Sequence, residues 1–361
     1  MESPVSVYSE FQPLEEMIVG TPYPSDSFDK LEDQETKDML KRIMIETEED
    51  CARLASLLQE HGVKVRRPKV MFDLMKYNDR GQGKMTYIDL LRFGYCYPNP
   101  PLWPRDMTLT LGNKILSVYS RTPGRWLEGW SFYDLMREYF EGGADWVSMP
   151  PPILEEEAQN YRHYENKALM FHAACFVRCG RDVFHTRPAF EDERAKGTRA
   201  GLDWVKRQFG DEFRFHQVDQ IGHLDGKIAF VKPGVLMSWL QPEKLPESLQ
   251  KWDVIQLHSK GEIPEEFNRL RGKRFYKDFI KKWLEDWIGS VEETYFDVNV
   301  ISINEELMIT NGDNPELRAE LKKRGVETIP FDFRHRYFWD GGLHCITLDV
   351  RRKGACEDYL S

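Results

Sequence analysis

Four residues of this chain have the types that chemistry on a planar cation needs. Cys345, in GGLHC, offers a thiol, and His223, in GHLDG, offers an imidazole that could lower the pKa of that thiol. Asp106, in WPRDM, and Asp225, two residues after His223, offer carboxylates. Two carboxylates in one small cavity need a cation between them, and a guanidinium suits them because it forms paired hydrogen bonds. The carbon of that guanidinium is an electrophile that a thiolate can attack.

A repeated pattern of hairpin, helix and strand positions these residues. Each hairpin is a short apolar, β-branched run broken by a turn signal such as Gly112 with Asn113, and a helix and a further strand follow. We predict hairpins at residues 107–118, 175–184, 227–238 and 298–310, and a fifth divided between residues 343–352 and 14–20. Because the fifth copy joins the two ends of the chain, the repeats predict a closed ring. The alternative is an open α+β domain in which hairpins recur by chance.

Polar residues stand just before most of these hairpins, and a closed ring brings such equivalent positions to one end of its central channel. In copies one, two, three and five they are Asp106, His172, His223 with Asp225, and His344 with Cys345. The fourth copy offers only Glu292, Glu293 and Asp297, without a clear register. We therefore predict a shared pocket in which His344 has a supporting role. Most other histidines, including His185, are predicted to lie at the surface.

Composition excludes several classes of function. The 361 residues contain 60 acidic and 50 basic side chains, so a formal net charge of -10 argues against nucleic-acid binding. No apolar run approaches the roughly 18 to 20 residues of a membrane span, and the first residues do not resemble a secretion signal. We expect one cytoplasmic domain over residues 1–361. The six cysteines lack a C-x-x-C pattern, so we expect free thiols and no structural metal.

Several motifs together resemble the glycine amidinotransferase family of the guanidino-group-modifying superfamily. They are FVRCGRDVF, the H-x-D of GHLDG, PRD, and above all GGLHCITLDVRRKG, while FQPLEEMIVG is similar to the family's opening strand. The resemblance covers essentially the full length. It implies a five-bladed α/β propeller of ββαβ repeats around a central channel.

The resemblance also implies an activity and a role for each motif residue. The activity is transfer of an amidino group, commonly from L-arginine, to a primary amine through a covalent amidino-cysteine, with ping-pong kinetics. Cys345 would be the nucleophile and His223 the general acid and base. Asp106 and Asp225 would bind the guanidinium. No cofactor or metal is implied, and the partners would be a small guanidino donor and an amine acceptor.

Two departures from the family pattern affect this prediction. The family motif F-D-A-A-D reads FHAAC here, so His172 stands where the family has the aspartate that pairs with the catalytic histidine. A neutral imidazole can orient His223 but cannot stabilise its protonated form as a carboxylate would. The stretch SWLQPEKLPES also lacks the family's arginine for the donor carboxylate. Arg269, Arg271 or Arg274 could replace it, or their segment is only solvated.

Three hypotheses follow, and they differ in the fate of the amidino group. The first is an amidinotransferase whose donor or acceptor differs from that of the glycine-using members. The second is a deiminase-type guanidine hydrolase, in which water resolves the amidino-cysteine. The third is a catalytically weakened homologue that only binds a guanidinium, which the replacement at His172 motivates. A homodimer, which is frequent in the superfamily, is left open by the sequence.

Overall fold

Five three-stranded sheets of one design form the frame of the computed structural model. It describes residues 3–29, 33–70, 99–120, 125–126, 128–151, 168–189, 196–258, 264–274, 277 and 296–360. In every sheet the first strand of the copy runs antiparallel to the second, and the third strand pairs parallel with the second. A parallel third strand requires a crossover connection, which the segment between the second and third strands supplies.

The strands fall at the predicted hairpins. They are β1 (Leu14–Val19), β2 (Lys64–Arg66), β3 (Thr108–Leu111), β4 (Lys114–Ser117), β5 (Asp145–Ser148), β6 (Phe176–Cys179), β7 (Asp182–Thr186), β8 (Arg214–Val218), β9 (Ile228–Lys232), β10 (Val235–Ser238), β11 (Asp253–Gln256), β12 (Ile301–Asn304), β13 (Leu307–Asn311), β14 (Glu327–Phe331) and β15 (Thr347–Arg352). Gly180, in the turn of the β6–β7 hairpin, has a φ of 65°, a conformation that glycine adopts without strain.

Helices supply most of the crossovers. The α-helices of the described residues are α1 (Gln34–Glu60), α3 (Pro104–Met107), α4 (Glu128–Glu141), α5 (Arg199–Arg207), α6 (Glu265–Gly272), α8 (Pro315–Lys323) and α9 (Arg336–Trp339). The third copy has only the 3₁₀ turns η7 (Pro242–Lys244) and η8 (Glu247–Leu249) where Pro246 predicts a short helix. Asn314 caps α8 as predicted, because its side-chain oxygen accepts from the backbone N–H groups of Glu316 and Leu317. Two further 3₁₀ turns are η1 (Ser25–Phe28) and η6 (Ala173–Cys175).

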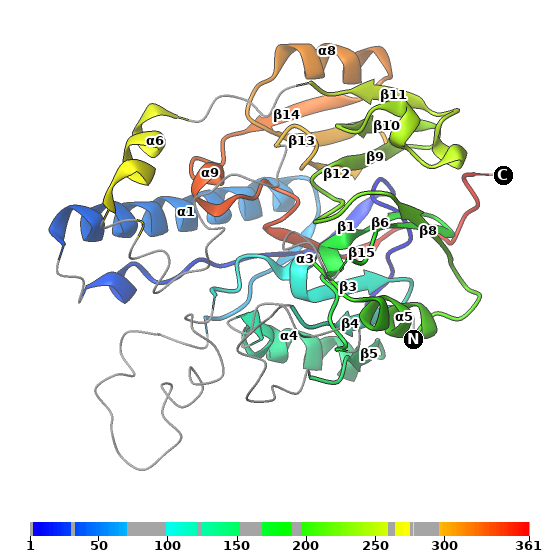
Figure 1. Cartoon of the computed structure of the whole chain (residues 1–361), viewed down its shortest axis with the longest axis horizontal. Helices are drawn as coiled ribbons and strands as arrows, with labels where there is room; N and C mark the ends of the chain where they lie inside the picture. Colours follow the sequence, from blue (N-terminus) through cyan, green and yellow to red (C-terminus); the bar gives the residue numbers. More distant parts are fainter. Residues whose placement is uncertain are drawn as a thin grey trace.

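The two ends of the chain close the ring. Strand β15, near the C-terminus, pairs antiparallel with β1, and β2 pairs parallel with β1, so this sheet repeats the design of the other four. Figure 1 shows α4, α5 and α8 at the outside of the molecule and β1 and β15 near its centre. The predicted α/β fold is confirmed, and its five sheets agree with a five-bladed propeller.

Each crossover helix buries one face against its sheet. In α1 the buried residues include Leu40, Ile43, Leu54 and Leu58, which recur at helical spacing and pack with residues of β1. Such burial stabilises the fold by about 25 cal/mol for each Å² of apolar surface removed from water. In the described part of the chain, no helix has both the length and the apolar composition that crossing a bilayer requires.

Candidate active site

The turns that lead into the first strands of the blades place the candidate residues. Asp106 and Cys345 each stand two residues before a first strand, β3 and β15, and Asp225 stands three residues before β9. Asn299 stands two residues before β12, the first strand of the fourth copy. Contacts bring these segments together, because Asn299 donates to the sulfur of Cys345 and Asp225 lies 3.8 Å from it.

Asp225 lies beside Cys345. Its carboxylate is buried, and its Oδ2 atom accepts a hydrogen bond from Nδ1 of His344 at 2.9 Å. The same Oδ2 lies 3.8 Å from the sulfur of Cys345. The other oxygen, Oδ1, is buried and has no hydrogen-bond partner among the described residues. Although burial alone would raise the pKa of Asp225, hydrogen bonding to His344 and the charges of nearby basic groups lower it.

Asp106 repeats this arrangement with a different anchor. Its Oδ2 atom accepts from Nη1 of Arg125 at 2.6 Å, whereas its buried Oδ1 has no hydrogen-bond partner within the described ranges. Arg125 is itself held by Glu128 through hydrogen bonds of 2.6 and 3.0 Å and lies over the ring of Trp103. Each of the two carboxylates thus has one anchored oxygen and one buried oxygen left to receive a donor. An unpaired buried acceptor is costly, so the pair is suited to a charged ligand with several N–H groups.

His172 and His223 form a hydrogen-bonded pair. Nδ1 of His172 lies 2.9 Å from Nε2 of His223, and Nε2 of His172 lies 2.6 Å from the hydroxyl of Ser120. Burial, His223 and Arg125 all lower the pKa of His172, so its ring is neutral near pH 7. A neutral ring can accept a hydrogen bond from protonated His223 while it donates to Ser120. His172 therefore occupies an orienting position without a negative charge.

Cys345 is a protonated thiol in the unliganded protein. Burial raises its pKa, and the charges of Asp225 and Asp106 raise it further, whereas hydrogen bonding from Asn299 and from the backbone of Gly342 acts in the opposite direction. Because both carboxylates raise the pKa of Cys345, Asp106, Asp225 and the sulfur lie close enough to interact electrostatically. His223 in turn lowers the pKa of Asp225. Nearest atoms of Asp106, His172 and His223 lie within 4.8 Å of one another.

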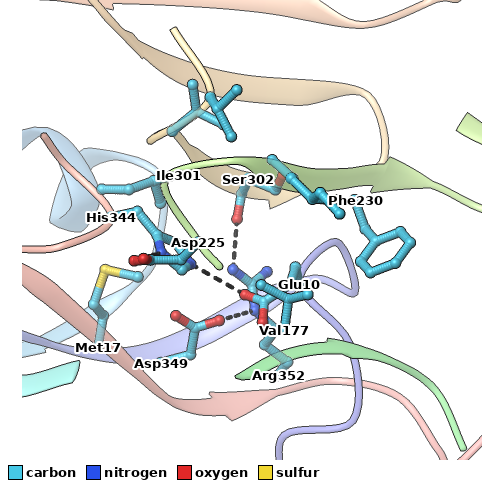
Figure 2. Close-up of a pocket in the computed structure, with 14 residues that line it drawn as sticks. Glu10, Met17, Val177, Asp225, Phe230, Ile301, Ser302, His344, Asp349 and Arg352 are labelled. Atoms are coloured by element: carbon cyan, nitrogen blue, oxygen red, sulfur yellow. Dashed lines mark hydrogen bonds and ion pairs between the residues drawn. The ribbon is translucent and has the colours of Figure 1, made fainter. Parts of the chain in front are cut away.

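A buried network of charged residues holds His344, which in turn contacts Asp225. Figure 2 shows His344 between Asp225 and Glu10, with Nε2 of His344 lying 3.2 Å from Oε2 of Glu10. Burial alone would raise the pKa of Glu10, but Arg178 and His344 lower it well below its usual range. Beside them is a cavity of about 20 Å³, which has room for one water molecule. The network fixes His344, and through it Asp225.

Two groups of side chains have metal-ligating atoms close together. Besides Asp106, His172 and His223, the atoms of Glu10, His344 and Asp349 also lie within 4.8 Å. Arginines already neutralise the second group, because Arg178 binds Glu10 at 2.8 Å and Arg105 binds Asp349 at 2.5 Å. In the first group, Arg125 binds Asp106 and the two histidines bind each other. In the described residues both groups are held by ion pairs and hydrogen bonds.

Sequence reasoning missed two residues of this site. Asn299, not the acidic residues before it, is the polar residue of the fourth copy: Asp297 binds the side chain of Asn314, and Glu292 and Glu293 lie outside the described residues. The signal was available, since Asn299 precedes its strand by the same two residues as Asp106 and Cys345. Arg125 has no such signal, because only the fold brings it to Asp106.

Three smaller predictions can also be compared with the structure. The prediction of a surface position is wrong for His185, which is buried in β7, where all five side chains are buried between neighbouring elements. Free thiols are confirmed for the described cysteines, while Cys96 lies outside the described residues. Of the three arginines considered for the donor carboxylate, Arg269 and Arg274 are exposed to solvent and Arg271 is half-buried over the ring of Phe267, so their role in donor binding stays a prediction.

The chain is similar in sequence to curated amidinotransferases. The chain is 26% identical over 393 residues to L-arginine:L-lysine amidinotransferase of Pseudomonas savastanoi pv. phaseolicola, covering 99% of this chain and 97% of the relative. It is 24% identical over 408 residues to mitochondrial glycine amidinotransferase of Xenopus tropicalis, covering 100% of this chain and 86% of the relative. No family model matches the sequence.

The fold agrees with these relatives. The structure matches that of inosamine-phosphate amidinotransferase from Streptomyces griseus with a TM-score of 0.72 and 24% identity, over 100% of both chains. The predicted resemblance to the amidinotransferases is therefore confirmed over the whole length of the chain.

Proposed function

We propose that this protein is an amidinotransferase that moves an amidino group from L-arginine, or another guanidino donor, to a primary amine through an amidino-cysteine on Cys345. The main support is the pair of buried carboxylates beside that thiol, each with one oxygen anchored and one oxygen unpartnered within the described residues. Relatives named for arginine with lysine and for glycine support the reaction class and the donor. The proposal treats residues 1–361 as one domain, because the two ends of the chain form one sheet.

In the first half of the reaction the donor guanidinium lies between Oδ1 of Asp106 and Oδ1 of Asp225. On donor binding the Cys345 thiol gives its proton to His223, and the resulting thiolate attacks the guanidinium carbon, so a carbon–sulfur bond forms. His223 then gives a proton to the departing nitrogen as the carbon–nitrogen bond breaks. The donor leaves as an amine, which is ornithine if the donor is arginine, and the amidino group stays on sulfur.

The second half reverses these steps with a new amine. The acceptor nitrogen attacks the amidino carbon, His223 takes its proton, and the carbon–sulfur bond breaks to return the sulfur. His172 keeps the His223 ring in place throughout. One imidazole serves both halves because it gains in the second half the proton that it gave in the first.

Donor binding is expected to ionise Cys345. Burial raises the pKa of the thiol and Asp225 and Asp106 raise it further, so a cation placed between the two carboxylates opposes their effect and lowers that pKa. The measurement is the ultraviolet absorbance of thiolate as a function of pH, taken as the difference between the wild-type protein and Cys345→Ser, with and without a guanidinium salt at non-denaturing concentration. A midpoint that stays fixed or rises with guanidinium would contradict this role of the two carboxylates.

The reaction class is tested by products. The protein is incubated with L-arginine and a panel of primary amines, and the products are identified by mass spectrometry. Ornithine together with a guanidino derivative of one amine supports the transferase. Citrulline or urea formed without an acceptor would indicate a hydrolase instead, and no turnover with any guanidino donor would favour a protein that only binds the cation.

Replacing His172 with aspartate is expected to raise the rate at neutral pH by about tenfold, because a carboxylate stabilises protonated His223 and general acid–base catalysis contributes about 10²–10⁴ in rate. The alkaline limb of the pH–rate profile should move to higher pH, because the protonated His223 that the departing amine needs then persists to higher pH. His172→Asn is the matched control, because it is neutral and should give no gain. An unchanged profile in His172→Asp would mean that this position does not act through His223.

A further inference from the structure

We infer that Asn299 is a positioning residue for Cys345. The amide group of Asn299 contacts both the sulfur and the backbone N–H of that cysteine. Its Nδ2 donates to the Cys345 sulfur at 3.0 Å, and its Oδ1 accepts from the Cys345 backbone N–H at 3.0 Å. Asn299 is fully buried. This role rests on the proposed function, in which Cys345 is the nucleophile.

The charge around the sulfur explains why such a donor is needed. The titratable groups that face Cys345 are Asp225, at 3.8 Å, and Asp106, with His344 behind Asp225. Two carboxylates oppose ionisation of the thiol, and a guanidinium offsets them only while the donor is bound. A hydrogen bond donated to sulfur favours the thiolate in both halves of the reaction, including the step in which the sulfur leaves.

Asn299 is itself held firmly. Its backbone carbonyl accepts hydrogen bonds from the side chain of Asn311 and, at 3.4 Å, from the N–H of His344. A Cβ atom added to Gly342 would lie 2.7 Å from Oδ1 of Asn299, so a larger residue there would push the amide away. The amide is therefore fixed against the loop that carries the cysteine, and its N–H has a defined direction.

A purely structural role is the competing explanation, and Asn311 separates the two. Oδ1 of Asn311 accepts from the N–H of Leu343 at 3.1 Å, so Asn311 also holds the loop before Cys345. Its Nδ2 donates to the backbone carbonyls of Phe296 and Asn299 rather than to sulfur. A structural role predicts similar effects for both asparagines, whereas the inferred role predicts an effect on the sulfur for Asn299 alone.

The test is a matched pair of neutral variants, Asn299→Leu and Asn311→Leu. Each removes the whole amide group without adding a charge, but only the first removes a donor to sulfur. The measured quantity is the pH midpoint for alkylation of Cys345 by iodoacetamide, with the modified peptide counted by mass spectrometry. We expect the midpoint of Asn299→Leu to rise by about one to two pH units and that of Asn311→Leu to rise by less than half as much.

Equal shifts in the two variants, or no shift in Asn299→Leu, would overturn the inference. If Asn299→Leu does not give a native circular dichroism spectrum, Asn299→Ser replaces it, since this smaller neutral side chain also removes the amide donor and should raise the midpoint. Alkylation needs no turnover, so the result is independent of the proposed function. If the midpoint shifts as expected but the protein transfers no amidino group, the proposed function is wrong and the role of Asn299 still holds.

Discussion

Cys345→Ser is expected to lower the rate of amidino transfer by about 10⁴-fold or more, which is the size of effect seen when a catalytic nucleophile is removed. A serine hydroxyl stays protonated near neutral pH, and the carboxylates of Asp225 and Asp106 oppose its ionisation as they do that of the thiol. The measurement is the initial rate of guanidino-product formation with saturating donor and acceptor.

Two controls make this result specific. Cys356→Ser changes an exposed cysteine and should keep the wild-type rate. Cys345→Ser should still bind the guanidino donor in a calorimetric titration, because Asp106 and Asp225 are unchanged. A variant that retained more than a few per cent of the rate would remove Cys345 from the proposed mechanism.

Asp225→Asn is expected to have two effects of opposite sign. Loss of a buried charge that faces the guanidinium should weaken donor binding by about a hundredfold or more. The same change should lower the pKa of the Cys345 thiol, because Asp225 raises it. We therefore expect a large fall in kcat/KM for the donor together with faster alkylation of Cys345 at neutral pH.

A matched buried aspartate controls for lost stability. Asp182 is buried and binds His216 at 2.6 Å, as Asp225 binds His344, and it has no described contact with Cys345. Asp182→Asn should leave both kcat/KM and the alkylation rate close to wild type. Unchanged donor binding in Asp225→Asn, or slower alkylation, would show that this carboxylate does not face both the cation and the sulfur.

The repeat and the ends of its elements could be predicted from sequence because their signals are local. Gly180 supports a turn by its positive φ, and Asn314 begins α8 by binding the N–H groups of its first turn. Apolar residues at helical or alternating spacing then assign each segment to a helix or a strand. The position of Asp106, Asp225 and Cys345 before first strands follows from the same repeat.

The partners across the site could not be predicted, because they depend on the fold. Nothing near Arg125 in the sequence indicates that it anchors Asp106. By residue type the acidic neighbours of Asn299 are the stronger candidates, because an amide does not transfer protons or attack carbon, yet Asn299 is the residue that contacts the sulfur. His185 belongs to no group of candidate residues in the sequence, which predicts a surface position, but β7 is the central strand of its sheet and is covered on both faces. The burial of His185 therefore follows from the central position of β7 in its sheet.

The most direct test of the proposed function is the mass of the intact protein after incubation with L-arginine in the absence of an acceptor. We expect a gain equal to one amidino group, located on Cys345 by peptide mapping and lost when a suitable amine is added. The gain should be absent in Cys345→Ser. Formation of guanidino product without any such adduct, or an adduct on a different residue, would contradict covalent transfer through Cys345.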